Sequence, residues 1–296
     1  MKKFMHHILM ILAFALTGGC ESEIDLDIDA FEDRIVVEGY ITSGQYARVS
    51  LTRNVGFFDP IDLTNVEDFI IEDAIVVITD GTIRDTCIFD LNEGYLPPVA
   101  YFGQEIIGQE NRRYDLEVYV DGKVLTATTL IPRVQPLDSL WWFPDAVHLE
   151  TGDSIGPIYY QFSDPDTLGN NHRLAYQRIG IDDIPYATSG ATRTDRLVNG
   201  LTYESTVYRS RTYAERYDSS VSEEIPDQFR FVPGQTVALY WNAIDPVTYE
   251  FWQSTRNNEA SDAFSPSQNL ASNIQGEGGI GIWGGYAESI DTVYIP

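Results

Sequence analysis

Short stretches in which apolar and polar residues alternate dominate the first third of the chain. In residues 46–53, alanine, valine and leucine occupy positions 47, 49 and 51, while arginine, serine and threonine occupy positions 48, 50 and 52. Residues 114–120 repeat the alternation, and residues 35–41 and 74–78 are runs rich in β-branched side chains. A period of two residues is typical of strands with one buried face, so all four segments are predicted strands.

Turns containing glycine join these strands. Asp121-Gly122 separates the strand at 114–120 from a similar segment at 124–131, and Asp80-Gly81 ends the run at 74–78. Asp-Gly between alternating segments is a strong hairpin signal, because a type I′ turn needs a positive φ at both central residues. With about seven short strands and no helical stretch, residues 31–132 are predicted to form an immunoglobulin-like β-sandwich.

A segment with two prolines, residues 132–136, leads into a second β-rich domain at 137–296. Its expected strands lie at 157–163, 172–181, 201–213, 229–232 and 236–241, with a loop-rich tail through Gly285 and a closing strand at 292–295. One helix is predicted at 246–257, because Asp245 can cap it and Pro246 suits its first position. The fold class is therefore mostly β: an N-terminal immunoglobulin-like β-sandwich followed by a second β-rich domain with one short α-helix.

Residues 1–19 have the features of a lipoprotein signal peptide. Two lysines precede an apolar run at 8–16, and small residues then lead to Cys20, which is the order of a secretory signal. The apolar run rises only about 14 Å as a helix, against a bilayer core of about 30 Å, so a permanent transmembrane helix is excluded. Cys20 resembles the cysteine of a bacterial lipobox, although Thr17 stands where leucine is usual. We expect lipid attachment at Cys20, including palmitate; the alternative is a secreted protein with an incidental cysteine.

An acidic tether at residues 20–30 follows the lipobox. Acids in this place resemble the export signal that sends Bacteroidota lipoproteins to the cell surface, and a plain solvated tether is a compatible interpretation. The whole chain has 19 basic and 45 acidic residues and a net charge of -26; loss of residues 1–19 removes two lysines and gives -28. Such an acidic protein is not expected to bind nucleic acid, because phosphate binding depends on lysine and arginine.

Several segments stand in the order and spacing of a known family. After the lipobox come RIVVEGYI at 34–41, VSLTR at 49–53, AIVVITDG at 74–81, YDL at 114–116, SNIQG at 272–276 and GIWGGY at 281–286. This order resembles the domain-of-unknown-function 4249 family, lipoproteins of the Bacteroidota, over nearly the whole chain. The resemblance implies an outer-membrane lipoprotein beside a TonB-dependent transporter. It carries no catalytic activity with it, and Cys20 is the one matching position whose chemistry is understood.

Thiol and imidazole groups are scarce. Once Cys20 is acylated, Cys87 is the only thiol left, so no intramolecular disulfide is expected. The apolar, strand-like surroundings of Cys87 predict a buried and unreactive side chain. Because the mature chain keeps only His148 and His172, a zinc site of histidines and cysteines is not expected. No metal and no cofactor is assigned.

Oxygen ligands gather in the segment 164–171. Asp164, Asp166, Asn170 and Asn171 share this segment with Gly169, and calcium loops combine alternating oxygen donors with a glycine at a sharp turn. The spacing and terminal glutamate of an EF-hand loop are missing. A plain hairpin loop is the preferred interpretation, and calcium binding stays open.

No catalytic signature is present. Gly-x-Ser-x-Gly does not occur, and a Ser-His-Asp hydrolase would depend on His148 or His172 as its base. The glycine-rich run at 276–285 lacks the Lys-Ser/Thr of a phosphate-binding loop, and close backbone packing around Trp283 explains it better. A glycosidase needs only two carboxylates at a set separation. With 45 acidic residues, the sequence neither excludes nor supports such a pair.

Trp141, Trp142 and Phe143 form the most prominent aromatic cluster. In a strand, Trp141 and Phe143 face one way and Trp142 faces the other. One face could stack on a sugar ring or on a partner protein, although a core at the domain junction is the preferred interpretation.

These patterns predict a non-catalytic, lipid-anchored outer-membrane protein, exposed at the cell surface, that captures a ligand or assists a TonB-dependent transporter. The alternatives are a surface glycan hydrolase that uses a carboxylate pair, and a cell-surface adhesion or scaffold module. No ligand-binding residue is identified by the sequence alone.

Overall fold

The computed structural model describes residues 33–54, 66–92, 98–148, 151–210, 229–259 and 270–296. The predicted signal peptide, the acidic tether and Cys20 lie outside the described residues. Within them no helix is both long and apolar enough to span a bilayer.

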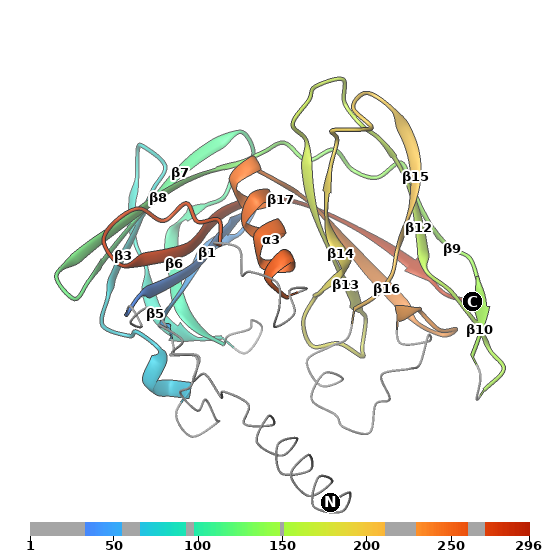
Figure 1. The fold of residues 1–296 in the computed structure, drawn as a ribbon, viewed down its shortest axis with the longest axis horizontal. Helices are drawn as coiled ribbons and strands as arrows, with labels where there is room; N and C mark the ends of the chain where they lie inside the picture. The colour runs from blue at the N-terminus through green and yellow to red at the C-terminus, as the bar shows by residue number, and fades with distance from the viewer. Residues whose placement is uncertain (1–32, 55–65, 93–97, 149–150, 211–228, 260–269) are drawn as a thin grey trace, which may run out of the picture. The chain divides into compact units, whose positions relative to one another are not determined.

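One large sheet forms the centre of the fold (Figure 1). Its eight strands lie in the order β14 (Tyr186–Thr194), β13 (Asn171–Arg178), β16 (Thr236–Ile244), β17 (Gly279–Tyr294), β1 (Ile35–Thr42), β2 (Tyr46–Arg53), β6 (Val99–Ile107) and β5 (Ile88–Leu91). Strands from both ends of the chain therefore belong to one sheet.

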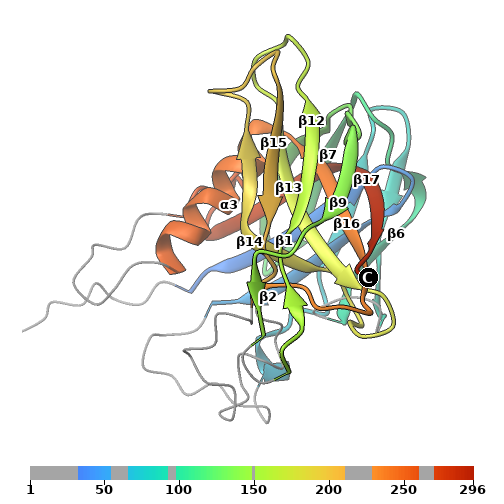
Figure 2. The same cartoon turned by 90° about the vertical axis from the view of Figure 1, so that its right-hand side faces the viewer.

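Two smaller sheets complete two sandwiches with the large sheet. The first consists of β4 (Arg84–Thr86), β3 (Ile75–Thr79), β7 (Arg112–Val120) and β8 (Lys123–Ile131), and the second of β15 (Thr202–Val207), β12 (Ile158–Ser163) and β9 (Ser139–Trp142). A hairpin of β10 (Ala146–Val147) and β11 (Ser154–Ile155), the 3-10 helix η1 (Val66–Phe69) and helix α3 (Pro246–Glu259) complete the described elements. In Figure 2 the second sandwich faces the viewer, with β12 and β15 running upright.

Both small sheets cover the same face of the large sheet. Trp283 and Ala287 of β17 belong to the core beneath the four-stranded sheet, and Val293 of the same strand packs against the core beneath the three-stranded sheet. Alternate residues of a strand share one face, so these three side chains point the same way. Helix α3 contacts β17, β13 and β14, and its Trp252 bonds to Tyr286, which points to the opposite face.

Strand β17 belongs to both sandwiches. Its first half runs parallel to β1, from the pair Ile35–Gly279 to the pair Thr42–Tyr286, and its second half runs antiparallel to β16 as far as the pair Thr236–Tyr294. The last strand of the chain thus closes the first sandwich as well as the second. The domain boundary at 132–137 stays a prediction from the sequence.

The expected loop through Gly285, followed by a strand only at 292–295, was wrong. Residues 279–294 form one strand, and its glycines are needed there because backbone passes so close. A Cβ on Gly281 would collide with the carbonyl oxygen of Val37, and one on Gly285 would collide with that of Leu130. Close backbone packing therefore explains these glycines, as expected.

Most of the other predicted elements are confirmed. Asp121 and Gly122 have φ values of 52° and 71° and form the whole connection between β7 and β8. The helix begins at Pro246, where Asp245 Oδ1 accepts a hydrogen bond of 2.8 Å from the Thr248 N–H. The mostly β fold class is confirmed. The strand expected at 229–232 is wrong, because only an isolated bridge from Phe231 to Gly156 forms there.

Each sandwich has its own buried core. The first contains Trp283, whose indole N–H donates to the Tyr114 carbonyl oxygen at 3.0 Å. Cys87 joins this core at 7% exposure, and burial raises the pKa of its thiol to about 12. The predicted buried thiol is therefore confirmed. The second core is aromatic, with Trp241 and Phe162 fully buried.

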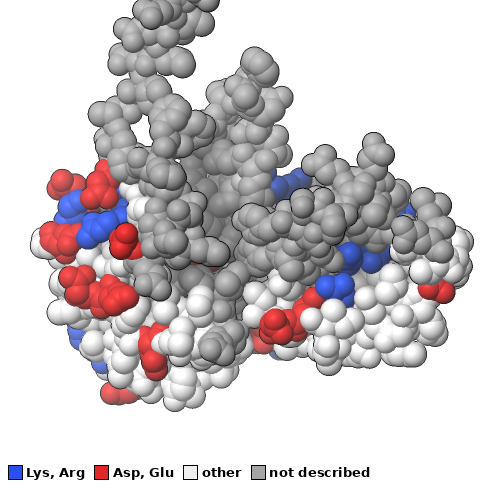
Figure 3. All heavy atoms as spheres, turned by 90° about the horizontal axis from the view of Figure 1, so that it is seen from below, with Lys and Arg blue, Asp and Glu red and all other residues white. Residues whose placement is uncertain are grey.

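Charges are unevenly distributed on the face seen in Figure 3. Acidic and basic side chains intermingle on the first sandwich, at the left of that view, while much of the second sandwich carries neither. Where grey atoms do not cover it, the second sandwich shows large areas without charged side chains in this view.

Candidate functional site

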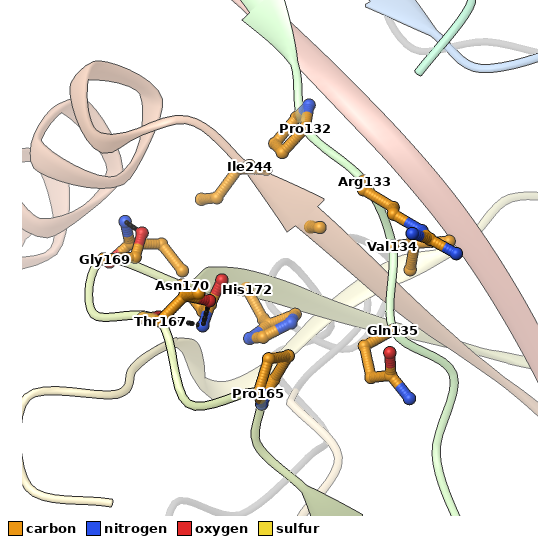
Figure 4. A pocket seen from close by; sticks show the side chains of 12 residues that line it. Pro132, Arg133, Val134, Gln135, Pro165, Thr167, Gly169, Asn170, His172 and Ile244 are labelled. Atoms are coloured by element: carbon orange, nitrogen blue, oxygen red, sulfur yellow. Dashed lines mark hydrogen bonds between the residues drawn. The ribbon is translucent and has the colours of Figure 1, made fainter. Parts of the chain in front are cut away.

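A crevice of about 350 Å³ opens where the two small sheets meet (Figure 4). One wall is the connection 132–135 between β8 and β9, and the other is the loop that joins β12 to β13. Ala243 and Ile244, at the end of β16, complete the lining. The crevice thus lies at the junction that the two prolines of 132–136 mark in the sequence.

The polar groups of the crevice come from both walls. Figure 4 shows Arg133 and Gln135 on one side, Thr167 and Asn170 on the other, and His172 between them. Arg133 is the only charged residue among the described residues that line the crevice. In a chain of charge -26, a lining with one arginine and no carboxylate favours an anionic ligand or one rich in hydrogen-bond acceptors.

The loop wall is held in place by hydrogen bonds. The Asn170 amide donates to the Thr167 carbonyl oxygen at 2.5 Å, and the Asn171 amide donates to that of Gly169 at 3.0 Å. From behind, one carboxylate oxygen of Asp195 accepts the N–H groups of Gly169 and Asn170 at 2.7 and 2.8 Å. Asp195 is 2% exposed, so a buried carboxylate fixes the position of this wall.

His172 lies at the inner end of the crevice, against the second core. Its ring stacks on Trp241 at a centroid distance of 4.4 Å and meets Phe162 edge-on at 5.1 Å. Burial alone lowers the pKa of His172 to about 3. The ring is therefore neutral at neutral pH and a weak base, whereas efficient general bases have pKa values near the working pH.

The structure does not bring the two candidate histidines together. His148 lies beside the β10–β11 hairpin, where its Nδ1 accepts a hydrogen bond from the Thr151 N–H at 3.3 Å. His172 belongs to β13. Nowhere in the described ranges do three or more His, Cys, Asp or Glu side chains gather in a way that could hold a metal ion.

The candidate calcium residues of 164–171 separate into different roles. Asp164 is 7% exposed and accepts a hydrogen bond from the Gly200 N–H at 3.2 Å, whereas Asp166 is exposed. Asn170 and Asn171 donate to carbonyl groups of their own loop. The segment joins β12 of the three-stranded sheet to β13 of the large sheet, and these two strands do not pair. The preferred hairpin loop was therefore wrong, because the chain changes sheets here.

The aromatic cluster divides between core and surface. Trp142 packs against the second core and donates its indole N–H to the Gly156 carbonyl oxygen at 3.1 Å. Trp141 instead stacks on Tyr159 of the neighbouring strand, at 5.9 Å between centroids and 15° between planes, and Phe143 is 62% exposed. The core interpretation therefore holds for Trp142 alone.

A second polar cluster, which the sequence did not indicate, lies beneath α3. The guanidinium carbon of Arg173 is 3.5 Å from the ring centroid of Trp252, whose N–H donates to the Tyr286 hydroxyl at 2.7 Å. Burial raises the pKa of Tyr286 to about 12, so this phenol stays protonated. The cluster attaches α3 to the large sheet, and its members come from three elements that sequence spacing does not relate.

Fold and site together define a mostly β protein in which two sandwiches share one sheet and a crevice opens between the two small sheets. The chain belongs to the family described as "Domain of unknown function (DUF4249)", whose model matches residues 21–291. No curated protein matches the chain. The family assignment predicted from the segment order is thus confirmed.

Proposed function

We propose that this chain is a non-catalytic lipoprotein of the outer-membrane surface that captures a small ligand, beside a TonB-dependent transporter. The N-terminal signal pattern with Cys20 supports the lipid anchor. Two acyl chains on one cysteine hold a protein on a membrane far more firmly than one chain does.

The crevice carries the capture part of the proposal. Its volume of about 350 Å³ lies within the ordinary range of ligand sites. Arg133 supplies one positive charge, and Gln135 and Asn170 supply amide groups on opposite walls. This combination suits a small anionic solute, since the amides can orient the ligand while the arginine pairs with its charge.

The properties of His172 favour binding over proton transfer. Its pKa of about 3 has burial as its sole cause, and no carboxylate contributes to it. A base held in this way lacks the orienting acid of a Ser-His-Asp triad. The hydrolase alternative gains nothing from Asp164 and Asp195 either, because at 7% and 2% exposure they are closed to a glycan chain.

Fractionation of cells tests the anchor. Wild-type protein should sediment with the outer membrane, and Cys20→Ser protein should be neither lipidated nor retained there. Affinity purification of the wild type from detergent-solubilised outer membranes should then recover a TonB-dependent transporter. Unaltered fractionation of Cys20→Ser would contradict the anchor, and recovery of no envelope protein would contradict the transporter partner.

Ligand screening with two matched variants tests the crevice. Small carboxylates and phosphates should include a compound that raises the melting temperature of the wild type. Arg133→Glu should abolish this effect, because it places a negative charge in the lining. Arg113→Glu reverses the charge of an exposed arginine on β7, outside the crevice, and should bind as the wild type does. Equal binding by both variants would contradict the site.

The adhesion alternative has one observation in its favour. The parallel rings of Trp141 and Tyr159, with Phe143 62% exposed nearby, offer an aromatic surface on the outer side of the three-stranded sheet. Aromatic surfaces of this kind suit sugars and protein partners. Loss of binding to a cell surface or a glycan array in Trp141→Ala, with Arg133→Glu unaffected, would favour adhesion over capture in the crevice.

A further inference from the structure

Two loops at one end of the second sandwich are joined around a pair of buried carboxylates. The loop 164–170 joins β12 to β13, and the loop 195–201 joins β14 to β15 (Figure 1). The Asp164 N–H donates to the Leu201 carbonyl oxygen at 3.0 Å, and the Asp195 N–H donates to that of Asn170 at 3.1 Å. These bonds bring Asp164 and Asp195, which are 31 positions apart in the sequence, into one buried junction.

Two oxygen atoms at this junction have no hydrogen-bond donor among the described residues. They are Oδ1 of Asp195 and Oδ1 of Asn199, and both are buried. The Asn199 N–H donates to the Asp195 carbonyl oxygen at 2.8 Å, so the two side chains leave the same turn. Buried acceptors are nearly always satisfied in folded proteins, and an unsatisfied charged oxygen is the costliest case.

Among the described residues, no lysine or arginine forms an ion pair with the carboxylate of Asp164 or with that of Asp195. Two adjacent carboxylates in a buried site need a counter-charge or a proton.

We propose that Asp164, Asp195 and Asn199 bind a calcium ion at this junction. Calcium takes about six to eight oxygen ligands in flexible geometry, from carboxylates, amide and backbone carbonyl groups and water. Zinc prefers nitrogen and sulfur, and magnesium keeps most of its water in a strict octahedron. A site with two carboxylates and an amide oxygen also agrees with the lack of three clustered acids among the described residues.

The site lies directly behind the wall of the crevice. Asp195 holds the N–H groups of Gly169 and Asn170 with its other carboxylate oxygen, and both residues line the crevice. A bound calcium ion would therefore fix the carboxylate that positions this wall. The proposal does not depend on the crevice binding any ligand.

Calcium titration tests the proposal. The sample is the chain without residues 1–19, with Cys20→Ser to prevent lipid attachment, after dialysis against EDTA. Isothermal titration calorimetry in physiological salt should show one calcium ion per chain, and the melting temperature should rise with calcium but not with magnesium. Asp195→Asn and Asn199→Ala should each weaken calcium binding at least about tenfold, because affinity follows the number and charge of the oxygen ligands.

Asp166→Asn is the matched control, since it removes one charge from the same loop at an exposed position; its calcium affinity should equal that of the wild type. In EDTA, Asp195→Asn should be no less stable than the wild type, because the substitution removes a buried like charge.

Failure of the wild type to bind calcium at millimolar concentration would overturn the proposal. Equal loss of affinity in Asp166→Asn would do so too, by indicating general attraction to an acidic surface. If Asp195→Asn does not fold, the comparison of Asn199→Ala with Asp166→Asn decides, because Asn199 is only partly buried.

Discussion

The ring of His172 stacks on that of Trp241 at the inner end of the crevice, with 27° between the ring planes and 4.4 Å between the centroids. This stacking buries an ionisable group in an aromatic core and lowers its pKa to about 3. The same contact therefore determines both the chemistry of the crevice and the behaviour of the fold in acid.

Acidification should destabilise the protein through His172. In the unfolded chain the pKa of His172 is about 6.5. On acidification the unfolded state therefore binds a proton at a pH at which the folded state does not. The stability present above about pH 6.5 is then lost as the pH falls toward the folded pKa of about 3. Between about pH 7 and about pH 4.5 this loss amounts to about 2.5 kcal/mol.

Urea unfolding of His172→Phe at these two pH values measures the effect. The variant keeps an aromatic ring on Trp241 and should lose about 2.5 kcal/mol less on acidification than the wild type does. Comparing the difference between two pH values removes any packing effect of the larger ring. His148→Gln, outside both cores, should lose as much as the wild type; an unchanged loss in His172→Phe would show that His172 is not the responsible group.

Local patterns predicted the parts of the fold that local contacts determine. The Asp121-Gly122 turn and the cap of α3 each involve residues within a few positions of one another, so the residue types alone reveal them. Strand β6 was missed because its glycine and its polar residues at 103–105 break the apolar run. The backbone N–H groups of residues 104–106 bond to the buried carboxylate of Asp85, which lies in another sheet.

Long-range pairing was beyond the sequence patterns. Strand β17 pairs in parallel with β1, more than two hundred residues earlier in the chain. Neither segment has a sequence feature that predicts this pairing. The same limit applies to the candidate site. Asp164 lies in a segment that composition identifies, but Asp195 and Asn199 reach it through two long-range pairings, of β13 with β14 and of β12 with β15. The one relevant signal in the sequence was the glycine-rich run 276–285, which indicated that another backbone passes close to it.

Gly281→Ala should destabilise the protein strongly. Gly281 has φ +125°, and a Cβ there would collide with the Val37 carbonyl oxygen of the paired strand. Both backbone strain and a forced displacement of β1 then oppose folding, at a combined cost of at least about 3 kcal/mol. Urea unfolding measures this loss, or expression without a folded product reveals it.

Gly234→Ala provides the comparison for that variant. Gly234 also has a positive φ, of +85°, but no atom lies within 4 Å of its added Cβ. Only the conformational strain remains, at about 1 kcal/mol. Equal losses in the two variants would mean that the contact between β17 and β1 does not limit side-chain size at Gly281.

Cys87 should resist thiol reagents as long as the protein is folded. The thiol is 7% exposed, and burial together with the charge of Asp85 raises its pKa to about 12. The reactive thiolate is therefore almost absent at about pH 8. In Cys20→Ser protein, where Cys87 is the single thiol, labelling with Ellman's reagent should be complete in about 6 M guanidinium chloride and negligible without it. Rapid labelling of the native protein would contradict the buried position.

The cap of α3 also connects this helix to the first sandwich, and the two roles can be separated by mutation. Asp245 Oδ1 accepts from the Thr248 N–H, while Oδ2 accepts from the Thr129 hydroxyl of β8 at 2.9 Å. Asp245→Ala removes the cap, which is worth about 1 kcal/mol. It also leaves the Thr129 hydroxyl, in a residue that is 2% exposed, without an acceptor, at about 1–3 kcal/mol more.

A double-mutant cycle in urea separates the two contributions. Thr129→Val removes the hydroxyl and leaves the cap intact, so Asp245→Ala should cost less in the Thr129→Val background than in the wild type, by about 1 kcal/mol or more. Asp245→Asn should lose less stability than Asp245→Ala, because asparagine caps helices nearly as well as aspartate but its single oxygen cannot also serve as the acceptor for Thr129. Additive losses in the cycle would mean that the Thr129 hydroxyl does not couple β8 to α3, and the connection would then rest on the Leu130 N–H, which also donates to Asp245 Oδ2, at 3.3 Å.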